Sequence, residues 1–86
     1  MNRYAIIVGS PVFLRLWSFL GCKEYAVSYP CSLENLKKLG AEDRSIRVIL
    51  YEESLLEQFS SQERNWFQES ADPCWISLPS ADGGTP

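Results

Sequence analysis

Side chains that could do chemistry are scarce in this sequence of 86 residues. Its thiols are Cys22, Cys31 and Cys74, and no two of them stand at the spacing of a metal-ligand pair. Histidine is absent, which excludes the usual zinc ligand sets and the Ser-His and Cys-His pairs of nucleophilic catalysis. We therefore expect three reduced thiols in a cytosolic protein that binds no metal or cofactor.

Polar residues that follow predicted strands form the second chemical group. The carboxyl ends of parallel strands share one edge of a sheet, and that edge is where α/β proteins bind ligands. Here it offers Ser10, Tyr29, Glu52, Glu53 and Ser80. The two glutamates are adjacent, so their side chains point in different directions and do not form an acid–base pair. A turn with the single Gly9, followed two residues later by Pro11, also lacks the amides of a phosphate site.

The segment at residues 4–8 predicts the central strand of the fold. It reads Tyr-Ala-Ile-Ile-Val, an apolar run without alternation and rich in β-branched side chains, which is typical of a parallel strand buried on both faces. Gly9 then allows a tight turn, Ser10 suits a helix N-cap, and Pro11 suits the first helical position. A strand that turns directly into a helix is the usual opening of an α/β fold.

The first helix is expected at residues 12–20 and should end in a left-handed cap at Gly21. At 100° per residue, its sheet-facing arc contains Val12, Phe13, Leu16, Trp17, Phe19 and Leu20. Arg15 and Ser18 fall on the opposite side, and Leu14 falls with them. The helical wheel therefore predicts that Leu14 is an outward-facing leucine.

The remaining elements follow in alternation: a strand at 25–28, a helix at 33–39, a strand at 46–51, a helix from 55 to about 69 and a strand at 74–78. Ser32 is expected to cap the helix at 33–39, and Gly40 to stop it. Ser54 with Glu57, and Ser60 with Glu63, both have the spacing of a capping box. The last helix is therefore either continuous or broken near Ser60.

This alternation predicts a single α/β domain at residues 1–80, followed by a flexible tail at 81–86. Right-handed crossovers between parallel strands give a four-stranded parallel sheet in the order 2-1-3-4. Helices should flank both faces of this sheet, in a Rossmann-like arrangement of three layers.

The charge of the chain limits its partners. Eight Lys and Arg against eleven Asp and Glu give a net charge of −3, and the sequence has no basic run. This composition argues against nucleic acid and against an anionic membrane surface as the main partner. No apolar stretch is long enough to span a membrane, and there is no signal-peptide pattern.

The order and spacing of these elements resemble the F subunit of the archaeal/vacuolar-type (V/A-type) rotary ATPases, from about residue 3 to residue 80. The matching pieces are Ile6-Ile7-Val8-Gly9, Trp17-Ser18-Phe19-Leu20-Gly21, the helix at 33–39, the strand that runs into Glu52-Glu53, and Ile76-Ser77-Leu78-Pro79-Ser80. Ser10 stands where the family usually has Asp. Family members also continue into a C-terminal helix along the rotor, so this chain is expected to be either a cut or a divergent short member with a reduced rotor contact.

The resemblance implies a non-catalytic central-stalk subunit of a proton- or sodium-translocating ATPase or ATP synthase. Such a subunit binds the coiled-coil D subunit of the rotor and meets other subunits of the complex. It would be cytoplasmic and peripheral to the membrane, with no direct insertion and no cofactor. We predict a partner interface on the rim of the first helix, made by Ser10, Leu14, Trp17, Ser18 and Glu52.

Two alternatives from other classes stay open at the sequence level. One is a small α/β enzyme or phosphocarrier that uses Cys22, which is followed by a lysine, or Cys31. The other is a receiver-like signalling module, because the strand and helix order is the same. A receiver needs an acidic pair, a phosphoaccepting Asp and a Lys at its strand ends, where this chain has Gly9-Ser10, Glu52 and Pro79-Ser80.

Overall fold

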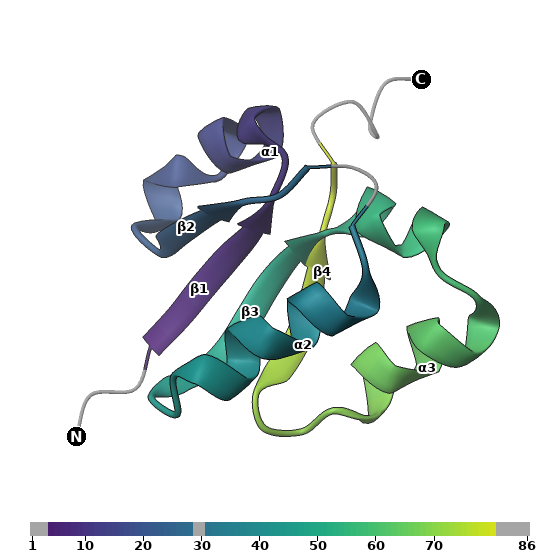
Figure 1. Ribbon diagram of the computed structural model, residues 1–86. Coiled ribbons are helices and arrows are strands. Elements are labelled where there is room, and N and C mark those ends of the chain that lie inside the picture. The colour runs from purple at the N-terminus through teal and green to yellow at the C-terminus, as the bar shows by residue number, and fades with distance from the viewer. Residues whose placement is uncertain (1–3, 29–30, 81–86) are drawn as a thin grey trace.

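The computed structural model describes residues 4–28 and 31–80. Its elements, shown in Figure 1, are β1 (Tyr4–Gly9), α1 (Pro11–Leu16), the 3₁₀ helix η1 (Ser18–Leu20), β2 (Lys23–Ala26), α2 (Leu33–Glu42), β3 (Ile46–Glu52), the 3₁₀ helix η2 (Glu53–Gln58), α3 (Ser61–Glu69) and β4 (Cys74–Leu78). The predicted tail at 81–86 and the predicted strand end at Tyr29 lie outside the described residues.

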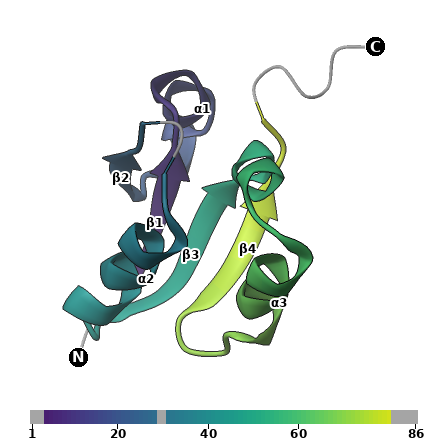
Figure 2. The same ribbon diagram turned by 45° about the vertical axis from the view of Figure 1, so that its right-hand side comes forward.

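The sheet has the predicted topology. Its four strands are all parallel and stand in the order β2-β1-β3-β4, with Ile6 of β1 opposite Ile49 of β3, and Ile49 opposite Trp75 of β4. In Figure 1 α2 crosses in front of β3, and Figure 2 shows α2 beside β1 and β3 and α3 beside β4. Helix α1 packs on the opposite face, so the expectation of helices on both faces is confirmed.

Two hydrophobic cores, one on each face, hold these layers together. The larger core joins Ile6, Val8 and Ile49 of the sheet to side chains of α2, η2 and α3. The smaller core joins Ile7 to Phe13 and Leu14 of α1. Because successive strand residues point to opposite faces, the uninterrupted apolar run of β1 contributes side chains to both cores.

The predicted phase of the first helix is wrong. Leu14, expected to face outward, is only 6% exposed. Four of the six side chains expected to face the sheet are instead exposed, with exposed fractions of 60% for Val12, 48% for Leu16, 75% for Phe19 and 42% for Leu20. The prediction is confirmed for Phe13, which is fully buried, and Trp17 packs partly buried against the same core.

The error has two physical causes. Seven of the nine residues at 12–20 are apolar, so the pattern does not define which arc faces the sheet. The α-helix also ends at Leu16, and residues Ser18–Leu20 continue as a 3₁₀ helix, so a single 100° wheel does not apply to both parts. Phe13 sets the true phase, because its ring packs directly on Gly9, where any Cβ would collide with it.

The helix stop at Gly40 is also wrong, since α2 continues to Glu42. Gly40 serves packing instead. A Cβ on this residue would lie 2.8 Å from Cγ of Pro73, so the missing side chain lets α2 approach the loop before β4. The second strand also differs, because it spans Lys23–Ala26 rather than 25–28.

The structure decides the open question of the last helix in favour of a break. Ser60 and Glu63 form a complete capping box: Ser60 Oγ accepts from the Glu63 amide at 3.2 Å, and Glu63 Oε1 accepts from the Ser60 amide at 2.9 Å. The other box does not form, because Ser54 lies inside η2 and its amide donates to Ser80 Oγ at 3.1 Å. Ser10 and Ser32 cap α1 and α2 as predicted.

Candidate functional site

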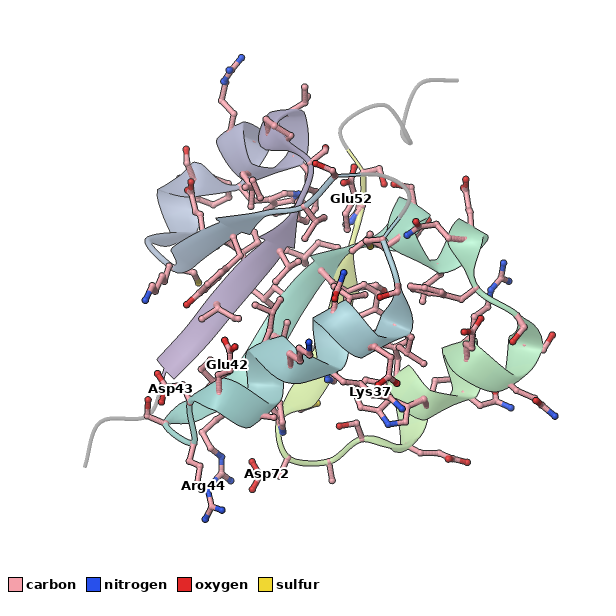
Figure 3. All side chains as sticks on the ribbon, viewed as in Figure 1. Lys37, Glu42, Asp43, Arg44, Glu52 and Asp72 are labelled. Carbon is pink, nitrogen blue, oxygen red and sulfur yellow. The ribbon has the colours of Figure 1, made fainter. Side chains whose placement is uncertain are left out.

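The carboxyl ends of β1 and β3 meet in the middle of the sheet, at the point where the strand order reverses. This is the position where open α/β sheets bind ligands. In this chain Glu52, at the end of β3, lies against Ser10, at the start of α1, and its carboxylate oxygen Oε1 accepts the Ser10 amide at 3.0 Å. Figure 3 shows Glu52 at this end of the sheet, and its side chain is only 5% exposed.

This contact fills the anion position of the fold with a group of the protein itself. The first amide of a helix that follows a parallel strand is the donor that phosphate-binding α/β proteins present to their ligand. Here that amide is already bonded to a carboxylate, and Ser10 Oγ accepts the Phe13 amide at 3.4 Å. A second anion at this position would meet the negative charge of Glu52.

The two residues after β4 form hydrogen bonds with segments on both sides of the sheet. The indole nitrogen Nε1 of Trp17 donates to the carbonyl of Pro79 at 3.2 Å, and Ser80 Oγ accepts the Ser54 amide at 3.1 Å. Ser80 is buried, so its hydroxyl serves as an internal partner rather than a group exposed to substrate. Of the polar residues that sequence reasoning placed at this edge, Ser10, Glu52 and Ser80 therefore act as structural links, whereas Glu53 is exposed and Tyr29 lies outside the described residues.

The five predicted interface residues have different fates. Ser10 and Glu52 are brought together, as expected from the topology. Ser18 is exposed, and its hydroxyl donates to the Arg15 carbonyl at 3.0 Å. As an interface, Ser10, Trp17 and Ser18 remain a prediction. Leu14 and Glu52 are removed from it, because a buried side chain does not present its surface to a partner.

Sequence reasoning missed the apolar side chains that α1 and η1 turn to solvent, namely Val12, Leu16, Phe19 and Leu20. The available signal was the number of apolar residues rather than their phase. Seven apolar residues in nine are more than one buried face of so short a segment accommodates, so some of them had to remain exposed.

The cysteines show no catalytic arrangement. All three are free, and Cys22 packs against the core below α1. Cys31 borders an open cleft of about 360 Å³ between β2 and α2, and its Sγ accepts a hydrogen bond from Gln58 Nε2 at 3.4 Å. The same glutamine accepts the Cys31 amide through Oε1 at 2.7 Å. Within 4–28 and 31–80, no cluster of three or more His, Cys, Asp or Glu side chains could hold a metal ion.

The pKa of the Tyr51 hydroxyl, in the larger core, is shifted by its surroundings. Burial raises the pKa of the Tyr51 hydroxyl above its ordinary value of 10.0, a hydrogen bond with Ser77 lowers this pKa, and the nearby charge of Glu53 raises it. The Tyr51 ring stacks on Phe67 at a centroid distance of 5.2 Å and meets Trp75 edge-on at 5.9 Å. The group is part of an aromatic core that joins β3 and β4 to α3.

None of the helices among the described residues is long and apolar enough to cross a membrane. The observations define a class: a small parallel α/β domain in which Glu52 and Ser80 accept hydrogen bonds from backbone amides at the carboxyl edge of the sheet. A scan against protein-family models finds no match, and a search of curated proteins finds no significant relative.

Among solved structures, the chain is similar to the crystal structure of the F subunit of the V-type ATP synthase from Archaeoglobus fulgidus. The TM-score is 0.61, the sequence identity is 20%, and the likeness covers 91% of this chain and 99% of the other. At this identity the comparison shows a common fold, the four-stranded parallel sheet with its helices.

Proposed function

We propose that this chain is a non-catalytic subunit of the central stalk of a V/A-type rotary ATPase or ATP synthase, in the position of the F subunit. The observation that carries the proposal is the likeness of fold to the F subunit of a V-type ATP synthase over nearly the whole length of both chains. The sequence resemblance points to the same family through the segments that end at Gly9, Gly21 and Glu53.

The occupied position between the ends of β1 and β3 supports a role without catalysis. An enzyme of this fold needs an open position at the strand ends for its substrate. Here the Ser10 amide donates a hydrogen bond to the Glu52 carboxylate, and the Ser54 amide donates one to the Ser80 hydroxyl. The receiver-like alternative loses support for the same reason, because Glu52 stands where a receiver has its phosphoaccepting aspartate and is buried.

In this role the chain binds the coiled-coil D subunit of the rotor and transmits torque with it, in a complex that moves protons or sodium ions. It lies on the cytoplasmic side and reaches the membrane only through the other subunits.

Co-expression with a candidate coiled-coil D subunit tests the proposal. We expect the two chains to co-purify and to sediment as a one-to-one complex. A folded chain, verified by circular dichroism, that passes through without retaining the coiled-coil protein would contradict the proposed function. Titration of the isolated chain with Mg-ATP should show no saturable binding, since neither a glycine-rich loop nor a phosphate-binding lysine follows β1.

A further inference from the structure

One buried side-chain polar atom among the described residues has no hydrogen-bond partner. Trp75 of β4 is only 7% exposed, and its indole nitrogen Nε1 forms no hydrogen bond. A buried indole N–H usually has an acceptor, because an unpaired buried donor destabilises the folded state. The Trp75 side chain therefore favours an acceptor from outside the chain.

Trp75 borders an open cleft of about 200 Å³ between α2, α3 and the segment before β4, which we call the Trp75 cleft. Its walls include Lys37, Ala41, Trp66, Asp72 and Pro73 in addition to Trp75. The rings of Trp66 and Trp75 lie 5.6 Å apart, so the walls are largely aromatic. An apolar cavity of about 150 Å³ accommodates benzene. The Trp75 cleft is therefore large enough for a molecule with one six-membered ring.

Lys37 gives the wall of the Trp75 cleft a positive charge. Its Nζ lies 5.1 Å from the centroid of the Trp66 ring, and Figure 3 shows Lys37 where α2 faces α3. Asp72 also lines the cleft, but its Oδ1 lies 3.5 Å from Arg47 Nε and its side chain is 66% exposed. The charge of Asp72 is therefore paired and screened by water. With Arg47 included, these groups leave one excess positive charge beside the unpaired donor.

A ligand of the Trp75 cleft has to match both the donor and the charge. A cation has no lone pair to accept from Trp75 Nε1, and a neutral amide leaves the Lys37 ammonium without a counter-charge. The C-terminal ends of α2 and α3 add partial negative charge nearby, which weakens the binding of an anion, but this effect falls off within the last turn of each helix. A carboxylate is the group that satisfies the indole N–H and the ammonium together.

We propose that the Trp75 cleft binds a small organic carboxylate. The carboxylate accepts from Trp75 Nε1 and lies against Lys37 Nζ, and the apolar body of the ligand packs on the Trp66 ring. An aromatic pocket with a few polar groups is the usual form of a small-molecule site. The cleft lies at the start of β4, far along the chain from the predicted interface on α1, so the inference does not depend on the proposed function.

The first experiment uses three probes of similar size that differ in charge: benzoate, benzamide and benzylamine. We expect benzoate to bind saturably, in the millimolar range usual for a ligand of so few atoms. Its binding should move the indole N–H resonance of Trp75 downfield in NMR spectra, because this proton then donates a hydrogen bond. Benzamide should bind more weakly than benzoate, and benzylamine should show no saturable binding.

The second experiment changes the walls of the cleft, with circular dichroism as the folding control. Lys37→Met removes the charge and should weaken benzoate binding at least about threefold while leaving benzamide nearly unchanged. Lys38→Met is the matched control, because Lys38 is exposed and outside the cleft, and it should bind benzoate as the wild type does. Ala41→Leu fills the cleft from an exposed position, so it should fold and abolish binding of both probes. Trp75→Phe removes the donor and should weaken benzoate binding at least about tenfold.

The wild-type resonance decides the inference even if Trp75→Phe does not fold. No saturable shift up to the solubility limit of benzoate would overturn it, and would mean that the N–H faces an aromatic ring such as Phe67, whose centroid is 5.1 Å away at an interplanar angle of 76°. Benzamide or benzylamine binding as tightly as benzoate would overturn the assigned ligand charge. Benzoate binding undiminished in Ala41→Leu would overturn the location.

Discussion

Glu52 offers the sharpest test of how the ends of β1 and β3 are joined. Its buried carboxylate accepts the amide of Ser10, a residue 42 positions away in the sequence, and so ties β3 to the start of α1. Two substitutions separate its effects. Glu52→Gln keeps a side-chain oxygen of similar reach and removes the charge, whereas Glu52→Ala removes the acceptor and leaves the Ser10 amide without it.

The expected magnitudes follow from the hydrogen bond. A bond to a charged group contributes roughly 1.5–3 kcal/mol and a neutral one about half as much, so we expect Glu52→Ala to lower the free energy of unfolding by about 2 kcal/mol and Glu52→Gln by about 1 kcal/mol. A domain of this length has a total stability of roughly 4–13 kcal/mol. At roughly 4–8 °C per kcal/mol, the alanine variant should melt roughly 8–16 °C below the wild type.

Urea and thermal denaturation followed by circular dichroism measure these differences. Glu53→Ala is the matched control, because Glu53 is the next residue and carries the same charge, but its side chain is exposed. The control should stay within about 0.5 kcal/mol of the wild type, as surface substitutions usually do.

Two results would refute the reasoning. An alanine variant as stable as the Glu53 control would mean that the Ser10–Glu52 contact contributes nothing. A glutamine variant more stable than the wild type would mean that the desolvation of the carboxylate outweighs the hydrogen bond.

Four further predictions address the core, the caps and the pH dependence. Leu14→Glu should prevent folding, seen as loss of the near-ultraviolet dichroism, because it buries a charge beneath α1; a native spectrum would contradict the burial. Gly9→Ala should cost about 1–3 kcal/mol in urea unfolding by collision with Phe13, and Phe13→Leu in the same chain should recover part of it. Ser60→Ala should cost about 1 kcal/mol by loss of the α3 cap, measured in the same way. Because burial raises the Tyr51 pKa in the folded state, the stability it contributes is complete below pH 10.0 and is lost as the pH rises through the folded pKa; unfolding measured across this range should show a steeper decline than in Tyr51→Phe.

The sequence by itself determined the topology of this protein. Short apolar runs without alternation, separated by helical segments, favour a parallel sheet. Right-handed crossovers with helices on both faces favour the order 2-1-3-4, which the structure has. Caps were equally local: Ser10, Ser32 and Ser60 each bond an amide three residues ahead, so their roles follow from residue type and spacing.

Tertiary contact decided the features that depend on neighbours distant in sequence. Gly40 is of the residue type that usually ends a helix. In this fold the helix continues through it, and the absence of a side chain lets Pro73 pack closely against it. Pairing of Ser10 with Glu52 required β3 to lie beside β1, which no local pattern specifies in atomic detail. The phase of α1 was set by the fit of Phe13 against Gly9, because a segment with seven apolar residues in nine satisfies several helical phases equally well until the sheet selects one.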